Sequence, residues 1–220
     1  MTLEAGWVPV ALSASIEPGT SAGAVVDGKE IVVWRDNSGK AHVWEDRCPH
    51  RGMRMSFGFV RGDHIACLYH GWQYDTAGQC RYIPAHPTLE VPQTIKVPTC
   101  SAEEKYGIVW ATASTEASLP DINAAADVAP VRSLYVECGA GDVIAALKTI
   151  GMGDLNGNLG LLALGEDQLL LAVQEISTAK TAIHIVLLVQ SVSDGGGKRK
   201  QYAQWAARLR FDLEQMAEVA

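Results

Sequence analysis

Two stretches of sequence decide the fold: residues 48–52, Cys-Pro-His-Arg-Gly, and residues 67–72, Cys-Leu-Tyr-His-Gly-Trp. Each contributes one cysteine and one histidine, and each lies at a turn between short runs typical of β-strands. Two loops of a rigid β scaffold can therefore bring four side chains to one centre. The glycine after each histidine lets the backbone pass close to that centre. The spacing predicts a metal site with the ligands Cys48, His50, Cys67 and His70.

Two kinds of metal centre use this set of side chains. A structural zinc ion is held in a tetrahedron by two cysteines and two histidines. A Rieske [2Fe–2S] cluster takes the same four side chains, two cysteines on one iron and two histidines on the other. The residue types alone leave both centres open.

The sequence around the motifs resembles the Rieske domain of ring-hydroxylating and demethylating oxygenases of the vanillate demethylase type. Besides the two motifs, the likeness rests on Tyr74-Asp75 with the turn at Gly78, on Trp7-Val-Pro-Val10 and on Tyr106-Gly-Ile-Val-Trp110. It spans roughly residues 6–111. The resemblance implies that Cys48 and Cys67 bind the inner iron of a [2Fe–2S] cluster and that His50 and His70 bind the outer iron.

The resemblance also implies redox properties and partners. Trp72 follows the second His-Gly pair, and neither loop has a second cysteine, as in the oxygenase type rather than the respiratory type. The respiratory type adds a disulfide and hydroxyl donors to the sulfurs. With fewer hydrogen bonds to sulfur, we expect a potential near the low end of the Rieske range, about −150 mV. Such a cluster accepts an electron from a ferredoxin or flavin reductase and passes it to an oxygenase partner. Related oxygenases commonly form trimers, which implies a homo-oligomer.

The second half of the chain departs from that family. Oxygenases of this type carry a mononuclear iron bound by two histidines and a carboxylate, with the motif Asp-x-x-His-x-x-x-x-His. Residues 112–220 contain one histidine, His184, within an apolar strand pattern. One imidazole cannot build that site, so mononuclear iron is not expected and the catalytic residues remain unknown. The remaining candidate is His184 with Asp142, Asp154 or Asp167, completed by a neighbouring subunit.

Composition shifts divide the chain into three parts. Residues 1–111 read as an antiparallel β domain, residues 112–130 as a linker rich in Ala, Ser, Thr and Asp, and residues 131–220 as a small α+β domain. In the last part, strand patterns at 131–137, 160–164, 168–174 and 181–190 precede a helix. The predicted apolar face of that helix is Tyr202, Trp205, Leu209, Leu213, Met216 and Ala220. The expected class is β-rich α+β, the last domain resembling a truncated helix-grip domain.

Composition excludes several classes of function. Among 220 residues, 25 acidic and 18 basic side chains give a net charge of −7, which argues against nucleic-acid binding. No apolar run is long enough to cross a bilayer, and the first twenty residues do not read as a signal peptide. Five cysteines do not make a disulfide framework. We therefore expect a cytoplasmic protein that binds neither nucleic acid nor membrane.

Other conspicuous residues have ordinary explanations. We expect reduced thiols at Cys80, Cys100 and Cys138, and surface or hydrogen-bonded histidines at His42, His64 and His86. Arg51, Arg54 and Trp72 flank the ligand loops and are expected to shield the centre from solvent. The glycine-rich segments 139–142 and 151–157 lack nucleotide-loop spacing and are expected to be turns. Residues 195–200, Gly-Gly-Gly-Lys-Arg-Lys, are expected to form a loop with solvated charges.

Three functions remain, in descending order of preference. The first is a Rieske electron-transfer protein or accessory component of an oxygenase system. The second is a terminal oxygenase for hydroxylation or demethylation, with a non-standard or subunit-shared iron site. The third is a zinc-stabilised or redox-sensing binding module.

Overall fold

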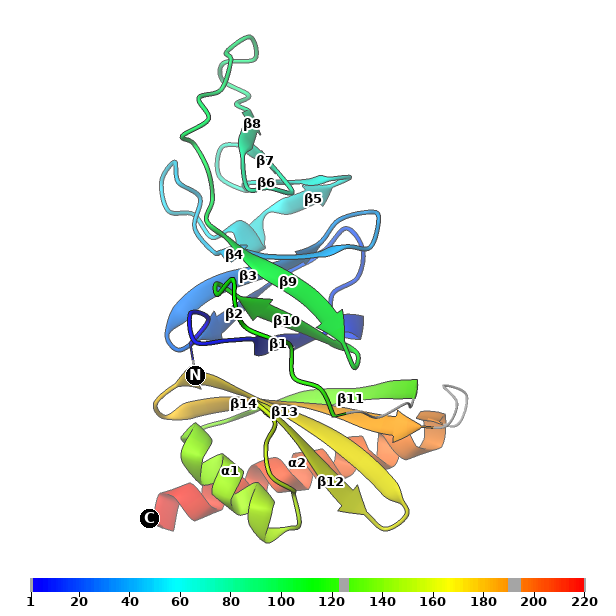
Figure 1. The fold of residues 1–220 in the computed structure, drawn as a ribbon. Coiled ribbons are helices and arrows are strands. Elements are labelled where there is room, and N and C mark those ends of the chain that lie inside the picture. The colour runs from blue at the N-terminus through cyan, green and yellow to red at the C-terminus, as the bar shows by residue number, and fades with distance from the viewer. Residues whose placement is uncertain (1, 123–126, 190–194, 220) are drawn as a thin grey trace.

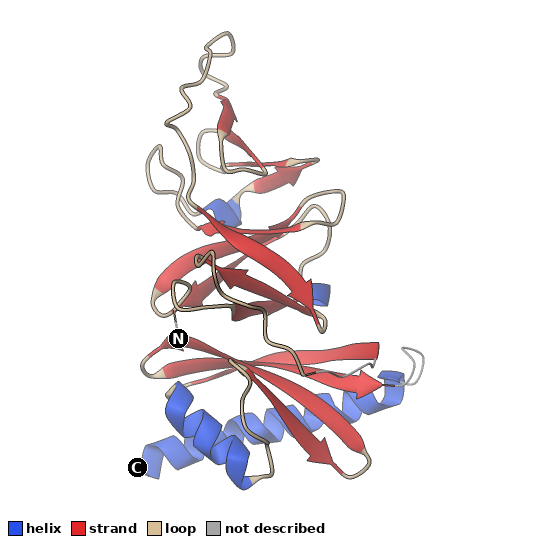
Figure 2. Cartoon of the chain, in the orientation of Figure 1, coloured by secondary structure: helices blue, strands red, loops and turns tan. Residues whose placement is uncertain are grey.

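A computed structural model describes residues 2–122, 127–189 and 195–219. Figure 1 shows three layers: a small sheet with long loops at one end, a six-stranded sheet in the middle, and a four-stranded sheet with its helices at the other end. Strands dominate the first two layers, and the long helices lie on the far face of the third (Figure 2). The expected β-rich α+β class is confirmed.

The middle sheet forms where apolar and aromatic residues cluster into short runs. Its strands, in the order β1-β10-β9-β4-β3-β2, are all antiparallel. They are β1 (Val8–Leu12), β2 (Ser21–Val26), β3 (Lys29–Arg35), β4 (Ala41–Glu45), β9 (Thr99–Lys105) and β10 (Ile108–Thr112). A short 3-10 helix, Ser13–Ser15, follows β1. Three large side chains are fully buried in this part of the fold, those of Trp34, Trp44 and Trp110. Their indole rings fill the space between the packed sheets.

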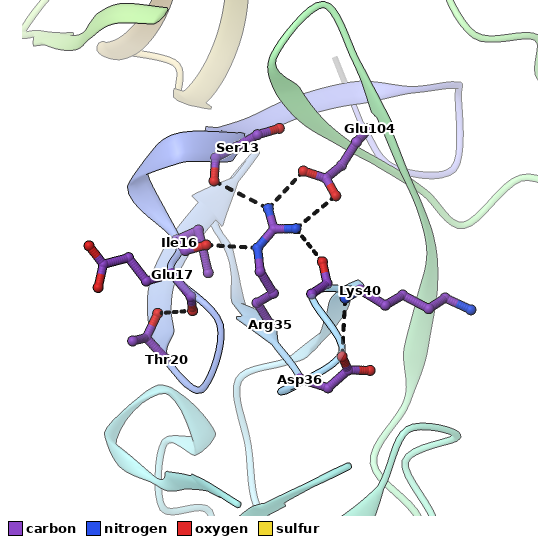
Figure 3. Close-up of polar contacts among 9 residues, drawn as sticks. Ser13, Ile16, Glu17, Thr20, Arg35, Asp36, Lys40 and Glu104 are labelled. Atoms are coloured by element: carbon purple, nitrogen blue, oxygen red, sulfur yellow. Dashed lines mark hydrogen bonds and ion pairs between the residues drawn. The ribbon is translucent and has the colours of Figure 1, made fainter. Parts of the chain in front are cut away.

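A buried arginine ties together the strands and turns at one corner of this sheet (Figure 3). Arg35 forms a two-pronged ion pair with Glu104 at 2.9 and 2.7 Å. Its Nε donates to the carbonyl oxygen of Ile16 at 2.7 Å, and Nη2 donates to that of Ser13 at 3.2 Å. Burying a guanidinium is tolerable here because its donors meet a carboxylate and backbone carbonyls together. The contact fixes the turn after β1 against β3 and β9.

The small sheet carries the two cysteine–histidine loops. Its strands, in the order β5-β6-β7-β8, are β5 (Phe59–Arg61), β6 (His64–Ala66), β7 (Gln73–Asp75) and β8 (Cys80–Tyr82). The first loop lies between β4 and the 3-10 helix Met55–Phe57, and the second joins β6 to β7. The second loop therefore joins two strands, as the sequence predicts, whereas a 3-10 helix separates the first loop from the next strand, β5.

The last part of the chain is a meander covered by helices. Its sheet order is β11-β14-β13-β12, with every neighbouring pair antiparallel. The elements are β11 (Asp127–Val136), α1 (Ala140–Thr149), β12 (Leu159–Leu164), β13 (Asp167–Ser177), β14 (Lys180–Val189) and α2 (Gly195–Val219). Apolar side chains from the sheet and both helices pack into one core, which fills the space between them. The predicted meander and terminal helix are confirmed.

Several local predictions need correction. Residues 127–130 of the expected linker belong to β11, and the expected turn at 139–142 opens helix α1. Residues 195–200 are helical rather than a loop, because α2 begins at Gly195 and Lys198 pairs with Asp167 at 2.6 Å. On the expected apolar face of α2, Met216 is 56% exposed, whereas Ala206 is buried. Ala220 and the end of the predicted strand at Gln190 lie outside the described residues.

The middle sheet rests on the C-terminal sheet through a buried apolar layer. Leu12, Ile108 and Trp110 pack against Leu170 and Val186 of the meander. Backbone bonds add to this contact, since the N–H groups of the β2–β3 turn donate to carbonyl oxygens of β13 at 2.9 and 2.7 Å. The division into domains at 1–111, 112–130 and 131–220 remains a prediction. Neither helix in the described part of the chain is long and apolar enough to cross a membrane.

Candidate metal centre

The two cysteine–histidine loops are built alike. In each, the cysteine N–H donates to the carbonyl oxygen five residues further on, at 2.8 Å in the first loop and 2.9 Å in the second. The cysteine carbonyl accepts from the N–H of the glycine four residues further on, at 2.8 and 2.9 Å. These glycines, Gly52 and Gly71, have φ values of 71° and 69°. The left-handed turn lets both chains reverse tightly around their cysteine.

Space also restricts the second glycine. A Cβ atom on Gly71 would lie 3.1 Å from Cγ of Pro84, in the segment that follows β8. A larger residue would therefore be strained by its backbone angle and crowded by this neighbouring segment. Gly52 has the same restrictive backbone angle but is not crowded, because its nearest neighbour would be an Arg47 side chain at 3.9 Å.

The two sulfurs lie in the dry interior of the small sheet. Cys48 is 2% exposed and Cys67 is 3% exposed, and both belong to an apolar core that includes Ile65 and Tyr74. The two thiols are within hydrogen-bonding reach of each other. That bond lowers the pKa of Cys48 and raises the pKa of Cys67, so Cys48 becomes a thiolate first. Thiolate is the form that binds metal.

Tyr74 adds a polar contact to one sulfur. Its hydroxyl lies 3.1 Å from Sγ of Cys48, and the side chain is fully buried. Burial and the neighbouring Cys48 raise the pKa of Tyr74, so the phenol keeps its proton and donates it to the sulfur. The resemblance implied fewer hydrogen bonds to the sulfurs than in the respiratory type, and this hydroxyl is one that the sequence reading did not assign. Tyr74 could have been named as a candidate from the sequence, because Tyr74-Asp75 is one of the segments that carry the resemblance.

The two histidines lie nearer the surface than the sulfurs. Their ring centroids are 4.5 Å apart, His50 is half-buried and His70 is exposed. The ring of His50 stacks on Trp72 at 4.2 Å with a 7° interplanar angle, which holds it in place. Nδ1 of His50 is buried without a hydrogen-bond partner among the described residues. A buried unpartnered nitrogen is costly in a protein, and a bound metal removes that cost.

This arrangement fits a two-iron cluster better than a single ion. Among the described residues, no three side chains of His, Cys, Asp or Glu gather closely enough to hold one metal ion. The four predicted ligands form a pair of sulfurs inside and a pair of imidazoles outside. A Rieske cluster needs such a division, because its two irons take different ligands. A tetrahedral zinc ion needs all four donors around one point.

Two acidic residues, Asp46 and Glu30, hold the chain on either side of the first loop through hydrogen bonds and ion pairs. Asp46, which is 1% exposed, accepts from the N–H and hydroxyl of Ser56, both at 2.6 Å. Glu30 pairs with Arg47 at 3.2 Å and also with Arg54, on the two sides of the loop. Arg54, predicted to shield the centre, is thus an anchor of the loop, whereas Trp72 does cover His50.

The remaining candidates lie away from the four predicted ligands or make ordinary contacts. His42 is buried against Asp36 at 2.9 Å and stacks on Trp34, and His64 lies beside Asp63 and Arg81. His86 and Arg51 are exposed. The five cysteines are free thiols, with Cys80 and Cys138 buried and Cys100 half-buried.

The candidate iron site at His184 is not assembled by the described residues. His184 is fully buried, with Ser133 at 2.7 Å from Nδ1 and Gln174 at 2.8 Å from Nε2. Asp154 instead pairs with Lys148, Asp167 pairs with Lys198, and Asp142 lies in the first turn of α1. Burial lowers the pKa of His184 to about 4, so this histidine is neutral. Its depth also keeps a neighbouring subunit from reaching it.

Known proteins match the half of the chain that carries the loops. Residues 6–98 match the model of the Rieske [2Fe-2S] domain. Oxidoreductase NdmD of Pseudomonas putida is 38% identical over 107 residues, which cover 48% of this chain and 18% of NdmD. Methylxanthine N1-demethylase NdmA of the same organism is 48% identical over 65 residues, covering 30% of this chain and 18% of NdmA. The chain spans about a fifth of the length of these curated relatives.

Solved structures extend the likeness of fold over the whole chain. The crystal structure of apo dicamba monooxygenase superposes with a TM-score of 0.79, covering 98% of this chain and 87% of that one, at 14% sequence identity. At that identity the likeness concerns the fold alone. Residues 6–98 thus resemble the Rieske [2Fe–2S] domain of ring-hydroxylating and demethylating oxygenases, whose cofactor is a Rieske-type cluster, and the chain shares its fold with these solved structures.

Proposed function

We propose that Cys48, Cys67, His50 and His70 hold the cluster and that the protein carries single electrons within an oxygenase system. When bound, the cluster supplies a one-electron redox centre. The observation that carries the proposal is the paired geometry, with two buried sulfurs beneath two surface imidazoles, of which Nδ1 of His50 is buried and unpartnered.

The protein surface around the histidines supports contact with other proteins. Leu68 and Tyr69, which precede His70 in the second loop, are 48% and 58% exposed. Apolar side chains gathered at a surface commonly mark a protein interface. The donor is a ferredoxin or flavin reductase, and the acceptor is an oxygenase partner that docks beside His70.

The residues of the two loops divide the work in this proposal. The buried cysteines keep water from the inner iron, and Tyr74 donates a hydrogen bond to Cys48. Trp72 fixes the plane of the His50 ring, and His70 is exposed at the surface. The imidazole side is therefore the side on which a partner reaches the redox centre with the least protein between them.

The test begins with metal content and then measures electron transfer. Freshly purified protein should contain about two irons per chain and show the Rieske visible and electron paramagnetic resonance spectra. A flavin reductase with NADH, or a reduced ferredoxin, should then bleach the visible bands in stopped flow. A Leu68→Glu/Tyr69→Glu variant should keep the spectra but react at least about tenfold more slowly. A colourless protein with one zinc would refute the proposal.

The alternative of a terminal oxygenase makes a different prediction about iron. It requires a third iron that survives in a Cys48→Ser variant lacking the cluster. The geometry of the described residues gives that alternative no support, because His184 is buried and hydrogen-bonded at both ring nitrogens. A persisting third iron, with oxygen consumption by the chain alone, would replace the electron-carrier proposal.

A further inference from the structure

A line of hydrogen bonds crosses the C-terminal sheet and ends at its edge strand. Nε2 of Gln174 donates to the carbonyl oxygen of Val25 at 2.8 Å, and this contact fixes the orientation of the amide because a carbonyl can only accept. Oε1 of Gln174 then accepts from Nε2 of His184, and Nδ1 of His184 accepts from the hydroxyl of Ser133. In this arrangement the Ser133 hydroxyl donates its hydrogen to His184, so its oxygen is left to accept further hydrogen bonds.

Ser133 lies in the wall of a cavity between the middle sheet and β11. The cavity has a volume of about 480 Å³ and is lined mostly by small and apolar residues of β1, β2 and β11. Ala22 and Ala24 of β2 leave the space open, and Val10 and Leu12 of β1 contribute apolar surface. The volume is within the range of sites for small organic ligands.

Two arginines give this cavity a positive end. Arg132 of β11 and Arg199 of α2 both line it. Nη1 of Arg132 donates to the carbonyl oxygen of Ala203 at 3.4 Å, one helical turn beyond Arg199, so both guanidinium groups lie beside the same stretch of α2. Among the described residues, none that lines the cavity is acidic, and no ion pair joins either arginine to a carboxylate. Against a net charge of −7, this local positive charge favours an anion.

We propose that the cavity binds a small organic carboxylate with an apolar body. The carboxylate lies between Arg132 and Arg199, which offer planar, charged donors. The apolar body lies over the alanines of β2 and the side chains of β1. None of these residues belongs to the metal centre, so the site stands or falls separately from the proposed electron transfer.

The test is calorimetric titration of the cluster-loaded protein with octanoate, 1-octanol and inorganic phosphate. Octanoate should bind with one site per chain, and at least about tenfold more tightly than either 1-octanol or phosphate. The Arg132→Gln/Arg199→Gln variant should weaken octanoate binding by at least about tenfold. Ala22→Phe, a change at an exposed position of the lining, should abolish binding by filling the space.

Lys200→Gln is the matched control, because Lys200 is an exposed cation beside Arg199 that does not line the cavity. This variant should bind octanoate as the parent protein does. Equal affinity for phosphate would reduce the site to a simple anion contact and overturn the proposal. Equal affinity for 1-octanol, insensitivity to the arginine changes, or no octanoate binding would also overturn it. Cluster spectra recorded on the same samples exclude misfolding as the cause of a loss.

Discussion

Two regions of the molecule differ in how they bury polar groups and expose apolar ones. One is the loop-bearing tip, residues 48–95, and the other is the C-terminal sheet with its two helices. In the tip, Nδ1 of His50 is buried without a partner among the residues that the structure describes, and Leu68 and Tyr69 are exposed. The C-terminal sheet partners both ring nitrogens of His184 and packs its inner face with apolar side chains. An unpartnered buried atom is tolerated only where something else completes it. The proposed cofactor and partner would complete the tip, whereas both ring nitrogens of His184 already have hydrogen-bond partners within the fold.

The strongest test of this contrast is the His70→Ala variant. We expect it to lose nearly all of its iron and the Rieske spectra, because the outer iron loses one of its two protein ligands. Thermal stability should fall with it, since the cluster cross-links the two loops and its binding energy contributes to folding. Iron analysis, electron paramagnetic resonance and a melting curve measure these effects.

The control for that variant is His86→Ala. His86 is an exposed histidine of the same tip and is not among the proposed ligands. It should keep its iron, its spectra and its melting temperature. A His70→Ala protein with full iron and an unchanged resonance spectrum would show that the ligand assignment is wrong, and the contrast between the two regions would lose its basis.

The second test changes the histidine of the other region. His184→Leu leaves the Ser133 hydroxyl and Oε1 of Gln174 buried without their partner, so the free energy of unfolding should fall by about 3 kcal/mol. The cluster spectra should not change. Urea unfolding gives the first quantity and electron paramagnetic resonance gives the second.

A double variant tells whether the lost hydrogen bonds cause the effect. Adding Ser133→Ala to His184→Leu removes the stranded hydroxyl, so part of the lost stability, about 1 kcal/mol, should return. Loss of iron in His184→Leu would mean instead that this histidine supports a metal after all.

The same contrast explains what the sequence could and could not predict. The paired loops were predictable because the proposed ligands lie in two short motifs, each folded by contacts within one loop. The surroundings of His184 were not, because its partners lie on β11 and β13 and meet it only through strand register. Helix α1 was missed since glycines at 139 and 141 suggested turns. Tyr74 was visible in the motif, but only the fold brings its hydroxyl to Cys48.

The third test concerns the middle sheet, and it asks whether a buried carboxylate there, Asp36, stabilises the fold through its hydrogen bonds, as the contacts of His184 do in the C-terminal sheet. Asp36 is buried, which alone would raise its pKa, but hydrogen bonds from His42, Ser38 and the Lys40 N–H lower that pKa from 3.8 to about 2. A lowered pKa stabilises the fold above the unfolded value near pH 4, and this contribution disappears as the pH falls towards 2. The shift corresponds to about 2 kcal/mol. Asp36→Asn should lose that stability at pH 7 and unfold less steeply with acid between pH 4 and 2.

Asp63 provides the matched comparison for the acid titration. Hydrogen bonds from Arg81 and His64 also lower its pKa to about 2, but this carboxylate lies on the surface, where solvent screens the pair. Asp63→Asn should therefore leave the acid transition nearly unchanged. Parallel urea titrations from pH 2 to 7 measure both variants. Equal effects of the two changes would show that burial does not set the strength of these carboxylate contacts.

The smallest expected effect lies within the tip itself. Tyr74→Phe removes the hydroxyl donor to Sγ of Cys48 and leaves the buried ring in place. A hydrogen bond to sulfur stabilises the reduced cluster, because reduction adds negative charge to the sulfurs, so its loss should lower the midpoint potential. A net bond of about 1 kcal/mol corresponds to a few tens of millivolts for one electron. Redox titration followed by visible absorption measures the shift, with the exposed Tyr82→Phe as control. A potential that stays the same or rises would mean that Tyr74 does not stabilise the reduced state. Tyr74 would then only fill space beside Cys48, as the apolar side chains fill the core of the C-terminal domain.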